Sequence, residues 1–141
     1  MKRTRITLLL IILCTFATLF AFSILDNTKP FVLRSTTTIA TDTQTSVFSM
    51  KGYERAHIIG TVTGSATTTE LVVIALRRET ATASLTDTPF NAVAVTVDDG
   101  YFELEVIKSI SKPYVSLLLM PDATCTVTII GVYYGADSSP F

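Results

Sequence analysis

The last third of the chain alternates apolar and polar residues in two runs that a short turn sequence separates. The first run lies within Lys112–Met120, the turn is Pro121-Asp122-Ala123, and the second run spans Thr124–Gly135. Alternation with a period of two places apolar side chains on one face of a β-strand and polar ones on the other. Two such runs around a turn predict a β-hairpin. The side chains expected to face inward are Val115, Leu117, Leu119, Cys125, Val127 and Ile129.

A lone hairpin is marginal in water, so the rest of the domain is expected to supply further strands. Four more runs of strand-forming residues precede it, at Glu54–Thr63, Glu70–Arg78, Phe90–Val97 and Tyr101–Ile107. The second of these is apolar on both faces, which is typical of a central strand, and Arg77 and Arg78 are expected to end it in solvent. The inward side chains expected from the other three runs are Ala56, Ile58, Val62, Val93, Val95, Val97, Phe102, Leu104 and Val106.

These runs define the fold class that the sequence predicts. Asp98-Asp99-Gly100 indicates a tight turn, and the other connections are too short for helical crossovers, so neighbouring strands should be antiparallel. Counting these six runs and the extended stretches expected within residues 26–46, we expect an all-β protein, an antiparallel, jelly-roll-like β-sandwich of about seven or eight strands, preceded by one hydrophobic helix. The expected segments are a signal peptide or transmembrane anchor at 1–25, a linker or arm at 26–46, the sandwich at 47–135 and a tail at 136–141.

The N-terminal run Ile6–Leu25 contains no charged residue and follows Lys2, Arg3 and Arg5. It could be a signal peptide, because Ala21-Phe22-Ser23 has the small-x-small form of a cleavage site. It is also long enough for a transmembrane anchor, and the basic start would then leave the domain outside the cytoplasm. Both interpretations stay open, and the second would bring the protein to a membrane.

The segment 26–46 is rich in threonine, whose branched Cβ favours extended backbone. Within it, Phe31-Val32-Leu33 could form a short strand or an arm that docks on a neighbouring subunit. Tyr133 and Tyr134, near the other end of the chain, could pack at a sheet end or at a subunit contact. The residues proposed as an interface are Phe31, Val32, Leu33, Tyr133 and Tyr134.

Charge and cysteine content narrow the possible partners. Eleven basic residues stand against twelve acidic ones, without the basic cluster that nucleic-acid binding requires. The two cysteines, Cys14 and Cys125, belong to different segments, so they imply no disulfide framework. Cys125 lies in a strand pattern and is expected to be a small buried hydrophobe.

The sequence contains no catalytic motif that we can identify. His57 is the single histidine and has no partners at metal-ligand spacing. Asp98, Asp99, Glu103 and Glu105 could hold calcium, but a turn followed by a solvated strand face explains them more simply. No nucleophile elbow or phosphate-binding loop is present. We therefore expect no enzyme activity, no catalytic, cofactor-binding or metal-binding residues, no cofactor and no small-molecule ligand.

Three short motifs carry a resemblance to a known family: Met50-Lys51-Gly52-Tyr53, Pro113-Tyr114-Val115 and Ile129-Ile130-Gly131-Val132-Tyr133-Tyr134-Gly135. Through them the region from Val47 to Gly135 resembles small bacteriophage proteins that are encoded among virion structural genes. The resemblance implies a β-sandwich that attaches to a capsid or its head–tail region and has no catalytic residues. The chain departs from that family in its apolar run Ile6–Leu25 and in its tail Ala136–Phe141, which is not basic.

Three classes of function follow from this reading. The first is a viral structural protein that decorates or links a virion, with other copies of itself and other virion proteins as partners. The second is a secreted or membrane-anchored subunit of a cell-surface filament, located in the cell envelope or outside the cell. The third is a glycan-binding β-sandwich module.

Overall fold

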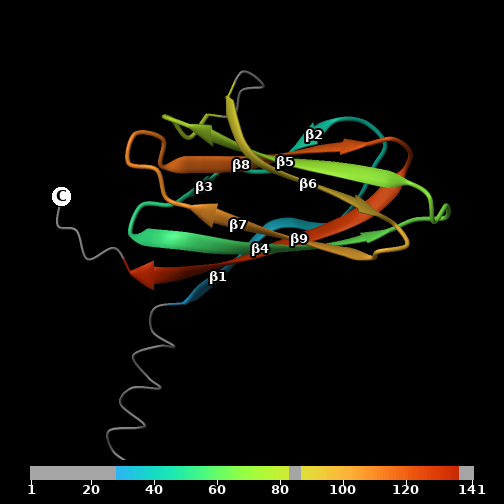
Figure 1. Cartoon of the computed structure of the whole chain (residues 1–141), viewed down its shortest axis with the longest axis horizontal. Helices are drawn as coiled ribbons and strands as arrows, with labels where there is room; N and C mark the ends of the chain where they lie inside the picture. The colour runs from blue at the N-terminus through green and yellow to red at the C-terminus, as the bar shows by residue number, and fades with distance from the viewer. Residues whose placement is uncertain (1–27, 83–86, 137–141) are drawn as a thin grey trace, which may run out of the picture.

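The computed structural model describes residues 28–82 and 87–136, which form two antiparallel β-sheets packed face to face (Figure 1). Sheet A has the strand order β1-β9-β4-β7, and sheet B has the order β2-β8-β5-β6, with the short β3 also paired to β8. The predicted all-β, antiparallel, two-sheet architecture is therefore confirmed. The strands are β1 (Lys29–Ile39), β2 (Thr43–Gln44), β3 (Phe48–Ser49), β4 (Tyr53–Thr63), β5 (Glu70–Arg78), β6 (Thr88–Thr96), β7 (Tyr101–Ile107), β8 (Tyr114–Pro121) and β9 (Cys125–Ala136).

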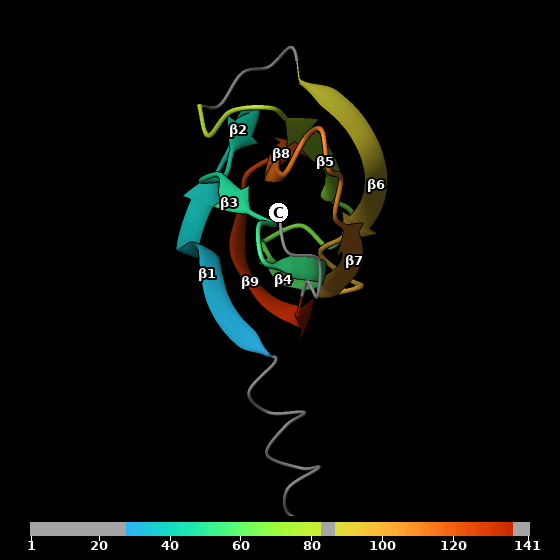
Figure 2. The ribbon, with the colours of Figure 1, turned by 90° about the vertical axis from the view of Figure 1, so that its left-hand side faces the viewer.

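The strand pairs are nested along the chain. β1 pairs with β9, β2 with β8, β4 with β7, and β5 with β6. Of these nested pairs, only β5 and β6 are consecutive strands joined as a hairpin. β2 and β3 both lie along β8, and each remaining connection crosses from one sheet to the other (Figure 2).

The predicted C-terminal hairpin is wrong in its pairing. β8 lies between β2 and β5 in sheet B, whereas β9 lies between β1 and β4 in sheet A. Both strands have one strongly apolar face, and these faces meet across the core instead of lying side by side. The turn at Asp98-Asp99-Gly100 likewise forms, with Gly100 at φ +76°, but it leads from β6 in sheet B to β7 in sheet A.

The segment predicted to be a linker or arm contributes two strands to the sandwich. β1 and β2 both fall within residues 26–46, and the side chains of Leu33 and Ile39 are buried in the core. The predicted boundary at residue 47 therefore lies inside the fold. The physical reason is the extended preference of the threonine-rich segment, which here is satisfied by pairing with β9.

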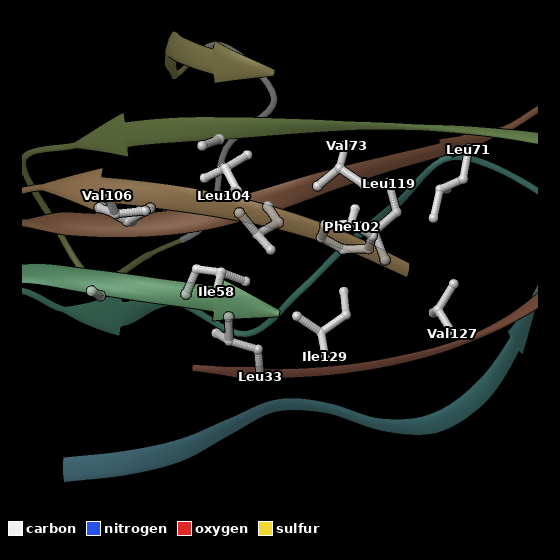
Figure 3. Close-up of a cluster of buried hydrophobic side chains, with 14 of the residues drawn as sticks. Leu33, Ile58, Leu71, Val73, Phe102, Leu104, Val106, Leu119, Val127 and Ile129 are labelled. Carbon is white, nitrogen blue, oxygen red and sulfur yellow. The ribbon is translucent and has the colours of Figure 1, made fainter. Parts of the chain in front are cut away.

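The core lies between the two sheets, where side chains from β1, β4, β5, β7, β8 and β9 point toward one another (Figure 3). The predicted inward faces are confirmed: Ala56, Ile58, Val62, Val95, Phe102, Leu104, Val106, Val115, Leu117, Leu119, Cys125, Val127 and Ile129 are buried. Val93 and Val97 are partly buried against this core.

Arg78 corrects another expectation, because it is only 2% exposed instead of ending its strand in solvent. Its Nη2 atom lies 2.7 Å from Asp87 Oδ2 and donates to Ser116 Oγ at 2.5 Å. Arg77 packs over the ring of Phe90, with 3.9 Å from its Cζ atom to the ring centroid. β5 stays paired with both neighbours up to its last residues. The Arg78 side chain is enclosed there and the carboxylate of Asp87 offsets its buried charge, whereas Arg77 is half-buried.

The predicted signal peptide or anchor at 1–25 lies outside the described residues, as do the tail residues 137–141. Within residues 28–82 and 87–136, no helix has the length and apolar character needed to cross a membrane.

Candidate interaction surface

The outer face of sheet A carries its exposed side chains in rows that run across the strands. The central row is apolar and consists of Val32 on β1, Ile130 on β9 and Ile59 on β4, which are direct neighbours in the strand register. We call these three residues the apolar row. Val32 is 65% exposed and Ile130 is 44% exposed, whereas Ile59 is half-buried, so the β1 and β9 members of the row face solvent.

A threonine array lies on one side of the apolar row. Thr36 and Thr38 on β1 contact Thr128 and Thr126 on β9, with Oγ1–Oγ1 distances of 2.9 and 3.0 Å. Thr61 and Thr63 on β4 are the register partners of these β9 threonines. Because the hydroxyls hydrogen-bond one another across strands, they hold this part of the face polar and ordered.

Charged groups lie on the other side of the apolar row. The hydroxyl of Tyr134 donates to Glu105 Oε1 at 2.5 Å, and Arg55 Nη1 donates to the same oxygen at 3.1 Å. These two hydrogen bonds lower the pKa of Glu105, and the bond from Tyr134 has the larger effect. His57 Nε2 lies 3.7 Å from Glu103 Oε2. The acids of β7 are thus paired with basic groups of β4, and Glu105 stays ionised at neutral pH.

The structure divides the residues proposed as an interface between the two faces of sheet A. Leu33 and Tyr133 are buried on the inner face, and Phe31 packs there with its ring centroid 4.2 Å from that of Tyr133. Burial raises the pKa of Tyr133 to about 12. Val32 and Tyr134 lie on the outer face. The role of these five residues in an interface stays a prediction, but only the outward pair could reach a partner directly.

Sequence reasoning missed Ile130 and Ile59 as surface residues. Each occupies the outward phase of a strand whose inward residues were identified correctly. The available signal was an isoleucine at a position where the alternation of the strand called for a polar residue.

The acidic residues considered for calcium do not form a ligand set. Asp99 Oδ2 accepts hydrogen bonds from the backbone N–H and the hydroxyl of Thr96, at 2.9 and 2.7 Å, so its carboxylate stabilises the turn between β6 and β7. Glu103 and Glu105 point outward from β7 toward β4. Within the described ranges, no group of three or more His, Cys, Asp or Glu side chains is placed to hold a metal ion.

The buried thiol of Cys125 has a raised pKa because burial disfavours the thiolate.

Fold and surface together define a small two-sheet β-protein whose outer sheet face is partly apolar. No protein-family model and no curated protein matches the chain. Its structure is similar to that of the Bacillus endospore appendages, described as disulfide-linked pili, at a TM-score of 0.51 and 11% identity, over 78% of this chain and 88% of the other. That similarity concerns the fold alone.

Two other solved structures are more distant. The SPBc2 prophage-derived protein YomS aligns at a TM-score of 0.43 and 11% identity, over 77% of this chain and 94% of its own. A family two carbohydrate esterase from Cellvibrio japonicus aligns at 0.42 and 9% identity, over 81% of this chain and 36% of its own. Neither supports a functional conclusion, and membership in a bacteriophage family stays a prediction.

Proposed function

We propose that the protein is a non-enzymatic structural subunit that self-associates through the outer face of sheet A. The apolar row of Val32, Ile130 and Ile59 carries this proposal. Single exposed apolar residues are ordinary on protein surfaces, whereas contiguous ones mark interaction sites. Here the exposed Val32 and Ile130 adjoin the half-buried Ile59 in one row across three strands, although the threonines and charges on either side of it are polar.

A second copy fits this face by symmetry. In a two-fold contact the same face meets itself, so each apolar row packs on the other. Four strands spaced by ~4.8 Å, with about seven residues rising ~3.3 Å each, give roughly 450 Å² per subunit. This is about half of the ~800 Å² per partner of a standard interface. A single contact of this kind is weak, which suits a subunit that several neighbours hold in place.

Two settings agree with such a subunit. The nested strand pairing is that of a jelly roll, an architecture found in viral capsid proteins, and it supports a minor virion or capsid-decorating component. The fold similarity to the Bacillus endospore appendages supports a filament subunit at a cell surface. Both are fold-level analogies. The second proposal includes no disulfide through Cys125, because the thiol of this residue is buried.

Sedimentation velocity on the full-length chain in a mild detergent tests the proposal. We expect wild-type protein to form concentration-dependent oligomers, and Ile130→Lys or Val32→Lys to shift it toward monomer. Ile110→Lys is the matched control, since Ile110 is 94% exposed and lies in the loop between β7 and β8, away from this face. A monomeric wild-type protein at high concentration would refute self-association. An oligomer size distribution that neither substitution changes would exclude this face as a contact.

A further inference from the structure

The sandwich has open strand edges, and proteins usually protect such edges with charges, proline, irregularities or short strands. β1 carries Lys29 and Pro30 and two irregularities in its pairing with β9. β2 and β3 contain two residues each. β7 carries Glu103 and Glu105. By contrast, the part of β6 from Asn91 to Thr96 has no charge and no proline, and it pairs regularly with β5.

The hydrogen bonds along β6 show which of its backbone groups face outward. Val97 N–H donates to Thr69 C=O at 2.9 Å, so the alternation of an antiparallel ladder directs residues 95, 93 and 91 toward β5. Ala92, Ala94 and Thr96 therefore turn their backbone groups away from it. Asp99 Oδ2 accepts from Thr96 N–H at 2.9 Å, and Asn91 Oδ1 accepts from Ala92 N–H at 3.0 Å. No such side-chain acceptor covers Ala94 N–H among the described residues.

The strand β7 beside β6 shows the same arrangement. Its outward carbonyls at Glu105 and Ile107 accept hydrogen bonds from Asn91 Nδ2 at 3.2 Å and from Arg77 Nη2 at 2.9 Å. β6 and β7 lie side by side at one side of the sandwich (Figure 2), but no ladder joins them in the part of the chain that the structure describes. Side chains thus cover the outward groups at both ends of β6, and the stretch around Ala94 stays open.

A groove of about 450 Å³ lies at this open stretch. Its lining residues are Val93, Ala94, Val95, Asp99, Tyr101, Phe102 and Glu103. Space for another backbone therefore adjoins the backbone groups of β6 that lack a partner strand.

We propose that β6 pairs antiparallel with β6 of a second copy, around a two-fold axis at Ala94. Ala94 would then exchange backbone hydrogen bonds with Ala94 of the partner subunit. Ala92 would face Thr96 of the partner subunit, and the two would join the ladder once their N–H groups leave Asn91 Oδ1 and Asp99 Oδ2. These side chains are small and neutral, so the strand is complementary to itself. The same pairing through β7 would set glutamates against glutamates, which is destabilising. This contact goes beyond the proposed function, because it uses a different surface from the outer face of sheet A.

Two different two-fold contacts on one subunit have a further consequence. A single isologous contact closes into a dimer. When one contact joins subunits through β6 and the other joins them through sheet A, alternating contacts extend without closing. The pair of surfaces therefore generates an open chain of subunits.

Disulfide trapping in the full-length protein tests the β6 contact. Residues that form a hydrogen-bonded antiparallel pair have Cα atoms about 5.5 Å apart, within the usual range for a disulfide. In a Cys14→Ser background, Ala94→Cys should give a disulfide-linked dimer at least about tenfold faster than Ile110→Cys, because pairing raises the local thiol concentration. Equal rates for the two variants would overturn the proposal.

A second pair of variants separates this contact from the sheet A contact. Ala94→Pro removes an outward N–H without removing a bond to β5, whereas Ala94→Ser keeps that N–H. Sedimentation should show loss of the β6 dimer in Ala94→Pro but not in Ala94→Ser. Oligomers lost in Ile130→Lys but kept in Ala94→Pro would leave the proposed function standing and refute the β6 pairing. The opposite pattern would refute the sheet A contact alone.

Discussion

Gly60 on β4 allows a direct test of how tightly the core fits against sheet A. Its register partner is Phe102 on β7, and the ring of Phe102 lies over the glycine. A Cβ atom added at Gly60 would lie 2.2 Å from Phe102 Cε1 and Cζ. Because carbon atoms pack at about 3.5 Å or more, the ring would have to move by roughly 1.3 Å in the Gly60→Ala variant.

The expected cost follows from the surroundings of the ring. Phe102 is 3% exposed, so the ring cannot move into solvent. Overpacking of this kind costs about 1–3 kcal/mol, and a displacement above 1 Å belongs in the upper half of that range. Alanine is favoured over glycine within a strand by about 0.5–1 kcal/mol, which offsets part of the cost. We therefore expect Gly60→Ala to lower the free energy of unfolding by about 1–2.5 kcal/mol.

Equilibrium unfolding in urea, followed by circular dichroism, measures this value. The double variant Gly60→Ala/Phe102→Leu should recover part of the loss, because the smaller side chain vacates the space that the new methyl group needs. A coupling energy of at least about 1 kcal/mol is expected for residues in such contact. If Gly60→Ala is neutral, or if the two substitutions are additive, the close fit of ring and glycine described here is wrong.

Three further predictions concern the core and its charges. Leu117→Ala should lower the free energy of unfolding by about 2–5 kcal/mol in the same urea assay, and a cost below about 0.5 kcal/mol would contradict the burial of this residue. Asp87→Ala should lower the free energy of unfolding by about 3–5 kcal/mol, because it leaves the buried Arg78 guanidinium without its carboxylate. Glu103 is an exposed acid and serves as the control: Glu103→Ala should lower the free energy of unfolding by less than about 1 kcal/mol. The pKa of Tyr133 is about 12 in the folded protein and about 10 in the unfolded chain. The stability that its burial contributes is therefore complete below about pH 10 and is lost as the pH rises toward 12, because the unfolded chain ionises first. Thermal unfolding should therefore show a steeper alkaline loss in wild type than in Tyr133→Phe.

The sequence predicted side-chain facing better than strand pairing, and the reason is geometric. A period of two assigns each side chain to one face of its strand, which is why Leu117 and Val127 were placed correctly in the core. The same period carries no information on which strand lies beside another, so β8 and β9 were paired although they lie in different sheets. Arg78 was misplaced because its carboxylate partner, Asp87, lies nine positions further along the chain, beyond the strand pattern.

The candidate surface shows the same limit. Val32 could be recognised as a surface candidate from its position between Phe31 and Leu33. The apolar row, however, exists only because Val32 on β1 is the register neighbour of Ile130 on β9. No local pattern in the sequence connects residues so far apart, and the row becomes visible only when the sheet is assembled.

The central position of β9 in sheet A affects how the protein is made. β9 is the last of the described strands, yet it lies between β1 and β4 and pairs with both. Until it emerges from the ribosome, the first strand has none of the ladder partners seen in the described structure, and the apolar inner face of sheet A cannot close. Folding dominated by such distant pairings is slow, and an incomplete chain exposes strand edges that promote aggregation. The sandwich can therefore close only after β9 has been synthesised, and until then β1 stays an unpaired, aggregation-prone strand.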